Sequence, residues 1–149
     1  MTPLIVKGAL FGLLLLSAAV WDMRNREIPN LIPALLLLCG LIGFRPAASA
    51  AGLLLVGGPF LLAAVLLIKR DGFAIGGGDV KLMGACGFVL GVWPGLIQVI
   101  LSLVLAVLVG LVECRLQKQP LSMVRLPLAP FFCFGGVSAY WLTAFALQI

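Results

Sequence analysis

Histidine is absent from this 149-residue chain. Its absence excludes catalysis by an imidazole base and removes the commonest zinc ligand. The four cysteines are widely spaced and form no CxxC pair, so the sequence indicates neither a zinc site nor a disulfide framework. They are Cys39, Cys86, Cys114 and Cys133. We expect them to be small apolar residues in or near membrane helices, and we expect the chain to use no metal and no other cofactor.

Charged residues are also scarce, at 10% of the chain, and only five of them are acidic. Hydrophobic residues make up 63%, and the mean hydropathy of +1.25 excludes an ordinary soluble globular protein. No stretch is polar enough for a separate soluble domain, so we expect a single membrane-embedded domain over residues 1–149. The net charge of +5 comes from basic residues scattered among predicted loops. We assign them to membrane topology and expect no nucleic-acid partner.

Apolar segments of roughly membrane-spanning length follow one another along the chain, and a hydrocarbon core about 30 Å thick asks for about 20 residues per helix. The segments are Leu4–Trp21, Leu31–Phe44, Ala50–Ile68, Val80–Gly91, Leu96–Val112 and Leu128–Leu147. The second is short, and the fourth is too short to span comfortably by itself. Pro59 is expected to kink the third, and residues 93–95 are expected to form a turn. The sequence therefore predicts an all-α, polytopic membrane bundle of about six transmembrane helices.

Basic residues concentrate in and beside the first, third and fifth predicted loops. They are Arg24, Arg26, Lys69, Arg70, Lys81, Arg115, Lys118 and Arg125. The opposite side holds only Lys7 and Arg45. By the positive-inside rule, the first group faces the cytoplasm and both termini face outside. A cleavable signal peptide over residues 1–20 is disfavoured, because its positive charges would precede the apolar run.

Two of the five acids, Asp22 and Asp79, lie where apolar helices meet loops on the same predicted side. A charge near the bilayer midplane costs roughly 2.5–3.5 kcal/mol and less toward the interface, so an intramembrane acid is a candidate functional residue. Two carboxylates that share a proton can activate water against a peptide bond. The structural alternatives are an acid paired with nearby arginines for Asp22 and a helix N-cap for Asp79.

The segment from Asp22 to Asn30 reads D-M-R-N-R-E-I-P-N. Pro29 can open the next helix, because its missing N–H is harmless in a first turn. Asn30 is expected to cap or orient that turn. Arg24 and Arg26 are topological anchors, and either can also hold an acidic substrate group.

Three consecutive glycines, Gly76, Gly77 and Gly78, precede Asp79. They permit a positive φ and allow another backbone to approach closely, so we expect a turn that admits an extended peptide beside Asp79. The glycines do not read as a phosphate-binding loop, because neither the spacing of a P-loop nor a preceding strand accompanies them.

Taken together, an acid before R-x-R-x-I-P-N and the motif G-x-G-D-x-K-L two helices later resemble the type IV prepilin peptidases. These membrane aspartyl proteases remove the leader peptide from type IV pilins, pseudopilins and related subunits. The resemblance implies that Asp22 and Asp79 are the two catalytic aspartates and that Lys81 belongs to the second motif. One carboxylate would accept a proton from water while the other, protonated, polarises the scissile carbonyl. The sequence does not indicate which of the two starts protonated.

The resemblance extends over essentially the whole chain. Gly84–Gly87 is similar to the family's small-residue helix, and Leu126–Phe131 is similar to its P-x-x-P-F element, which we expect to brace the last helix against the site. The chain departs from the larger bifunctional members, which carry paired CxxC motifs and methylate the new N-terminus. It resembles the short, peptidase-only form of tight-adherence (Flp) pilus systems, so we expect no N-terminal methyltransferase domain.

The implied function is cleavage of type IV or Flp prepilins or pseudopilins at the cytoplasmic face of a bacterial or archaeal cell membrane. Family substrates carry an acid shortly beyond the cut, and Arg24, Arg26 and Lys81 remain equal candidates to bind it. The alternative is a small proton- or cation-coupled transporter that uses the same acids. A non-catalytic assembly subunit and a presenilin-like protease that cuts inside the bilayer are further alternatives.

Overall fold

The computed structural model describes residues 2–66, 68–69, 72–73, 76–118 and 126–146. Within these residues the chain forms six helices and one small hairpin. The helices are α1 (Thr2–Asn25), α2 (Leu31–Gly40), α3 (Pro46–Leu66), α4 (Gly77–Leu90), α5 (Val92–Gln117) and α6 (Ala129–Ala146). The strands β1 (Ile68–Lys69) and β2 (Gly72–Phe73) pair antiparallel between α3 and α4. The predicted all-α membrane bundle is confirmed, and the hairpin is its one addition.

Four of the described helices are long and apolar enough to cross a membrane. These spans are Pro3–Asn25, Pro46–Leu66, Val92–Leu116 and Ala129–Ala146. The other two are shorter: α2 has 10 residues and α4 has 14, which at 1.5 Å per residue gives about 15 and 21 Å. Many large apolar side chains point outward, among them Leu54 and Leu108. Such a surface suits a lipid environment.

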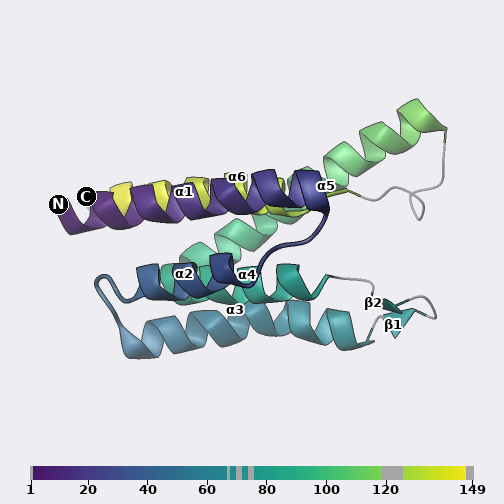
Figure 1. The fold of residues 1–149 in the computed structure, drawn as a ribbon. Coiled ribbons are helices and arrows are strands. Elements are labelled where there is room, and N and C mark those ends of the chain that lie inside the picture. Colours follow the sequence, from purple (N-terminus) through teal and green to yellow (C-terminus); the bar gives the residue numbers. More distant parts are fainter. Residues whose placement is uncertain (1, 67, 70–71, 74–75, 119–125, 147–149) are drawn as a thin grey trace.

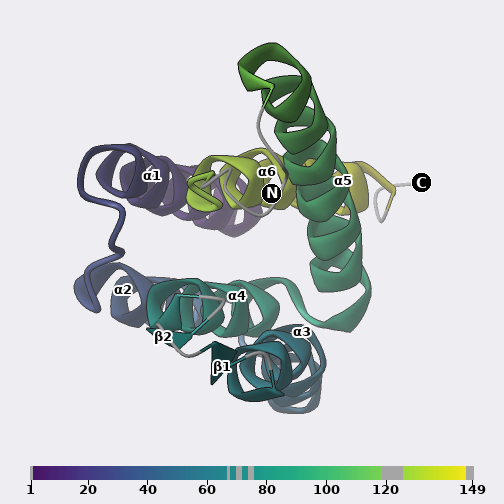
Figure 2. The same cartoon turned by 90° about the vertical axis from the view of Figure 1, so that its right-hand side faces the viewer.

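The helices form two layers. In Figure 1, α1 and α6 lie side by side and antiparallel in one layer, while α2, α4 and α3 form the other. Figure 2, turned by 90°, shows α5 crossing at the side of both layers, where it contacts α6 and α3. The end of α1 and the starts of α4 and α6 therefore meet at the end of the molecule that carries the hairpin.

Glycines set the close packing of α3 against α4. A Cβ on Gly52 would collide with the carbonyl oxygen of Gly87, and a Cβ on Gly57 would come within 2.7 Å of the Cα of Gly84. Small residues at such a crossing let two helix backbones approach directly, which is how membrane helices gain dispersion energy without a hydrophobic driving force. The backbones of α3 and α4 therefore pack directly against each other along the middle and the C-terminal half of α4.

The start of α5 differs from the sequence-based expectation. Residues 93–95 were predicted to form a turn, but α5 already begins at Val92 and contains them. Pro94 fits in the first turn, because the N–H that it lacks has no acceptor there. The chain reverses instead at Gly91, whose φ of 81° lies in the region that favours glycine.

Candidate active site

Asp22 lies inside α1 rather than after it. The helix continues to Asn25, and Arg26 ends it in a left-handed conformation with φ 54°, donating its N–H to the carbonyl oxygen of Asp22 at 2.8 Å. This extra turn directs the Asp22 side chain into the bundle, where only 6% of the residue is exposed. Arg24 and Arg26 are both exposed. The alternative in which Asp22 pairs with these arginines is not what the described residues show.

The carboxylate of Asp22 is bound by the first turn of α6. The N–H of Ala129 donates to its Oδ2 atom at 3.0 Å. Within that turn Pro130 has no N–H, and Phe131 donates to the carbonyl of Leu128 at 3.1 Å. Ala129 therefore carries a first-turn donor with no acceptor in its own helix, and Asp22 supplies one. The expectation that Leu126–Phe131 braces the site agrees with this contact.

Asp79 lies in the first turn of α4. Gly76 precedes the helix in an extended conformation and accepts the N–H of Asp79 at 3.0 Å, while Gly77 and Gly78 are already helical. None of these three glycines has a positive φ. The expectation of a glycine turn here is therefore wrong, because α4 starts at Gly77, three residues before the predicted segment Val80–Gly91, and includes Gly77 and Gly78.

Gly78 has a packing role instead. A Cβ at this position would lie 3.0 Å from the Cβ of Ile28, in the segment that joins α1 to α2. A second tie joins the same two parts of the chain: Lys81 donates from Nζ to Oδ1 of Asn30 at 2.8 Å. These contacts hold the start of α4 against the chain that follows Asp22.

Asn30 is the residue before α2, but its side chain makes no capping hydrogen bond. The capping expectation is therefore wrong, and the side chain accepts from Lys81 on α4 instead. Pro29 is half-buried, and its carbonyl accepts the N–H of Ile32 at 3.1 Å at the entrance of α2.

The two carboxylates interact electrostatically. Burial, and secondarily the negative charge of Asp22, raise the pKa of Asp79 to about 6 from its ordinary value of 3.8. The hydrogen bond with the Gly76 backbone opposes this shift only in part. Asp79 lies on α4, which is not one of the four helices long enough to cross the membrane. A carboxyl with a raised pKa beside a second carboxylate is the usual arrangement for acid–base chemistry.

The structure thus brings together most of the residues that the sequence singled out. Asp22, Asp79, Gly76, Gly78 and Lys81 lie around one end of the bundle, whereas both arginines are exposed, Arg24 in the last turn of α1 and Arg26 directly after it. Sequence reasoning missed the main-chain donor on α6 and the contact made by Ile28. A backbone N–H has no residue-type signature, and the only available signal was the proline that follows it.

Fold and site first define a class: a helical membrane protein in which two acids from different layers meet at one end. The model of the type IV leader peptidase family matches residues 9–111. The chain is also 35% identical over 148 residues to the prepilin leader peptidase/N-methyltransferase of Bacillus subtilis (strain 168). That match covers 89% of this chain and 54% of the relative, so the chain spans about half the relative's length. No solved structure matches. The chain belongs to the type IV leader peptidase family.

Proposed function

We propose that this protein is a membrane aspartyl endopeptidase that removes the leader peptide from type IV or Flp prepilins or pseudopilins. One observation carries the proposal: Asp22 in the last turn of α1 and Asp79 in the first turn of α4 come from different layers but lie at the same end of the bundle, where the charge of Asp22 adds to burial in raising the pKa of Asp79. Membership of the leader peptidase family supports the substrate class. The absence of paired CxxC motifs from the sequence is the reason to expect no methylation by this chain.

The surroundings of the two acids support a division of roles. Asp22 accepts a main-chain N–H at the N-terminus of α6, where the partial positive charge of the helix favours a carboxylate. Asp79, with its pKa raised to about 6, holds a proton more readily. Asp22 is then the base and Asp79 the acid. Two neighbouring carboxyls titrate as a pair, so one shared proton is the working state.

The proposed reaction balances with these two groups and one water. Asp22 takes a proton from the water as its oxygen attacks the scissile carbonyl carbon, and Asp79 gives its proton to the carbonyl oxygen. The tetrahedral intermediate collapses when the peptide nitrogen leaves with the proton held by Asp22. A hydroxyl proton of the intermediate returns to Asp79. The pair regains its starting state without a metal or a second cofactor.

The cytoplasmic position of the site is part of the proposal. The basic residues Arg24 and Arg26 lie at the C-terminal end of α1, at the end of the bundle where both acids lie, whereas Lys7 lies near the opposite end of that helix. The positive-inside rule then orients the site toward the cytoplasm. A leader that remains in the cytoplasm would meet the acids at the membrane surface.

The test is cleavage of a co-expressed pilin-like precursor, read as a gel shift at matched membrane levels. Asp22→Asn and Asp79→Asn should each abolish the shift, because the first removes the base and the second the acid. Glu27→Gln is the matched control, since it changes an exposed acid in the same region isosterically. Cleavage by both Asn variants would contradict the assignment. If the wild type cuts no precursor but moves protons in vesicles, the transporter alternative replaces it.

A further inference from the structure

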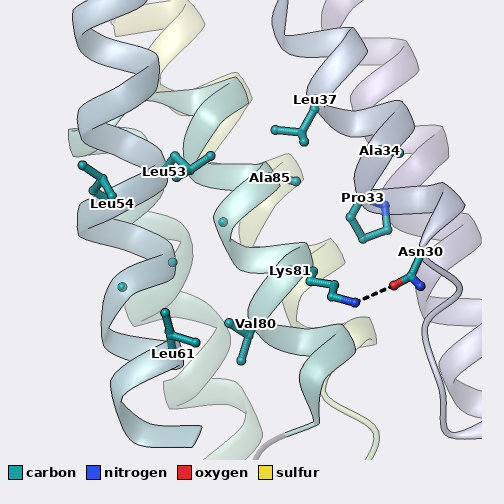
Figure 3. A pocket seen from close by; sticks show the side chains of 13 residues that line it. Asn30, Pro33, Ala34, Leu37, Leu53, Leu54, Leu61, Val80, Lys81 and Ala85 are labelled. Atoms are coloured by element: carbon teal, nitrogen blue, oxygen red, sulfur yellow. Dashed lines mark hydrogen bonds between the residues drawn. The ribbon is translucent and has the colours of Figure 1, made fainter. Parts of the chain in front are cut away.

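A groove runs along the layer formed by α2, α3 and α4. Its volume is about 490 Å³, and most of its wall is apolar, with Leu37 on α2 and Leu53, Leu54 and Leu61 on α3. Figure 3 shows Leu37 on α2 and Leu53 on α3 facing the space beside α4, whereas Leu54 lies on the outer side of α3 in this view. From Leu53 to Leu61, α3 rises about 12 Å, which is the length of roughly two helical turns. The groove therefore has room for a short stretch of an apolar helix.

Part of the groove lacks side chains. Gly58 and Gly84 both line it, and a Cβ at either position would meet no atom within 4 Å. Glycine in place of alanine destabilises a helix by about 1 kcal/mol. No neighbouring atom explains the glycines at positions 58 and 84, because a Cβ would fit at either. Gly57 differs, because its own Cβ would collide with α4. Exposed glycines of this kind permit another helix backbone to lie close.

One end of the groove is cationic. Lys81 and Asn30 line that end, and in Figure 3 the lysine ammonium points to the asparagine oxygen, 2.8 Å away. A neutral amide leaves the lysine charge uncompensated, and the described residues give Lys81 no carboxylate partner. Lys81 follows Asp79 by two positions in the same helix. The charged end of the groove therefore lies at the level of the first two turns of α4, which also carry Asp79, although neither Asp79 nor Asp22 lines the groove.

We propose that this groove holds the apolar helix of the substrate, with an acidic side chain at the start of that helix paired with Lys81. The inference rests on the proposed function and adds to it the place where the substrate binds. A helix seated there begins at the level of the first two turns of α4, and the chain that precedes it continues toward the end of the bundle where Asp22 and Asp79 lie. The groove also distinguishes the three basic candidates, because Arg24 and Arg26 do not line it.

An anionic lipid shares the same chemistry, with an acyl chain for the groove and a phosphate for Lys81. Gly58 and Gly84 favour a helix as the occupant, because a surface without side chains lets another helix backbone lie close. A flexible acyl chain does not need such a surface. The cationic end also lies toward the end of the bundle that carries both acids. The proposed occupant of the groove is therefore the substrate helix, and the experiments below distinguish it from a lipid.

The first experiment is site-specific photo-crosslinking. A benzoylphenylalanine is placed at Leu54 in the groove, or at Leu108 on the exposed face of α5 as the control, in the Asp79→Asn background to keep the precursor uncut. Adducts with the precursor at position 54 and not at 108 support the proposal. No adduct at 54, or equal yields at both positions, overturns it. Failure of the wild type to cut the precursor counts against the proposed function alone.

The second experiment measures kinetics with purified precursor in micelles of fixed lipid content. Gly58→Leu and Gly84→Leu should raise KM roughly tenfold with little change in kcat, because they fill the groove without touching the acids. Leu108→Trp adds bulk on α5 and should leave both constants unchanged. An unchanged KM in both glycine variants overturns the proposal, as does a defect that added phosphatidylglycerol restores, since the occupant is then lipid.

A charge exchange tests the lysine. Lys81→Glu should lower kcat/KM roughly tenfold on the native precursor, and a precursor whose acid at the start of the helix is changed to lysine should be cut better by Lys81→Glu than by the wild type. Lys81→Arg should retain most activity on the native precursor. If the variant precursor gains nothing from the exchanged enzyme, Lys81 does not pair with that acid.

Discussion

The main-chain N–H of Ala129 donates to the Oδ2 atom of Asp22 at 3.0 Å, across 107 positions of sequence. The contact joins the first helix to the last and provides a buried carboxylate with a fixed donor. It does so with an atom that no side-chain substitution removes, apart from proline. The orientation of Asp22 therefore depends on where α6 begins.

Replacing Ala129 with proline should lower kcat roughly tenfold to a hundredfold with little change in KM, because it removes the donor from a carboxylate required in the transition state. Proline is well tolerated at the first position of a helix, so α6 should persist. Ala129→Gly keeps the N–H and is the matched control. Steady-state cleavage of a purified precursor measures the effect. Equal kcat for the two variants would show that the hydrogen bond does not position Asp22.

The stability of the protein should depend on pH through Asp79. Its pKa is about 6 when folded against an ordinary 3.8, so the folded state binds the proton more tightly. The cost of ionising it is absent below pH 3.8, grows between the two values and is constant above about 6. Asp79→Asn removes this cost and should stabilise the fold by about 1–3 kcal/mol above pH 6, with the gain vanishing toward about pH 4.

Thermal unfolding in detergent at several pH values measures this difference. Glu27→Gln, at an exposed acid, controls for the loss of one carboxylate as such. A gain for Asp79→Asn that is independent of pH would show that the effect comes from packing and not from the proton.

Gly77 and Gly78 should respond oppositely to alanine, although they are neighbours in the same helical turn. A Cβ at Gly78 lies 3.0 Å from the Cβ of Ile28, whereas a Cβ at Gly77 meets nothing within 4 Å. Gly78→Ala should therefore cost about 1–2 kcal/mol, and Gly77→Ala should be neutral or stabilising through helix propensity. Unfolding temperatures compare the two. Similar losses would mean that the segment around Ile28 does not pack against α4.

The crossing of α3 and α4 gives a second matched pair. A Cβ on Gly52 would collide with the backbone of Gly87 and lie 2.8 Å from main-chain atoms of Gly91, none of which can rotate away. Gly52→Ala should cost about 2–4 kcal/mol, while Gly58→Ala, in open space, should cost nothing. Detergent-solubilised yield and unfolding temperature are the measurements. Tolerance of Gly52→Ala would contradict the close contact.

The sequence predicted the elements of this fold better than their ends. Long apolar runs determine the number of helices, because a segment in the bilayer must form its backbone hydrogen bonds within itself. The ends depend on contacts: α1 continues past Asp22 because Arg26 closes it in a left-handed conformation, and α5 begins before Pro94 because Gly91 makes the reversal. Amino-acid composition predicts neither the end of α1 nor the start of α5.

The same distinction applies to the site. Asp22 and Asp79 stood out because acids are rare in this chain and costly in a membrane. The sequence did not indicate that Asn30 accepts from Lys81 or that Gly78 packs against Ile28, because both contacts depend on which segments become neighbours. The assignment of the acids as catalytic remains a prediction that the experiments above address, and the single-domain expectation remains a prediction.

The hydrogen bond between α6 and Asp22 also has a consequence for biosynthesis. Asp22 lies on α1, which is synthesised before α6, the helix that carries its donor. The carboxylate pair thus acquires its final geometry only when α6 has been inserted and docked. A chain that stops after α5 would carry both acids but would lack the main-chain donor that fixes Asp22.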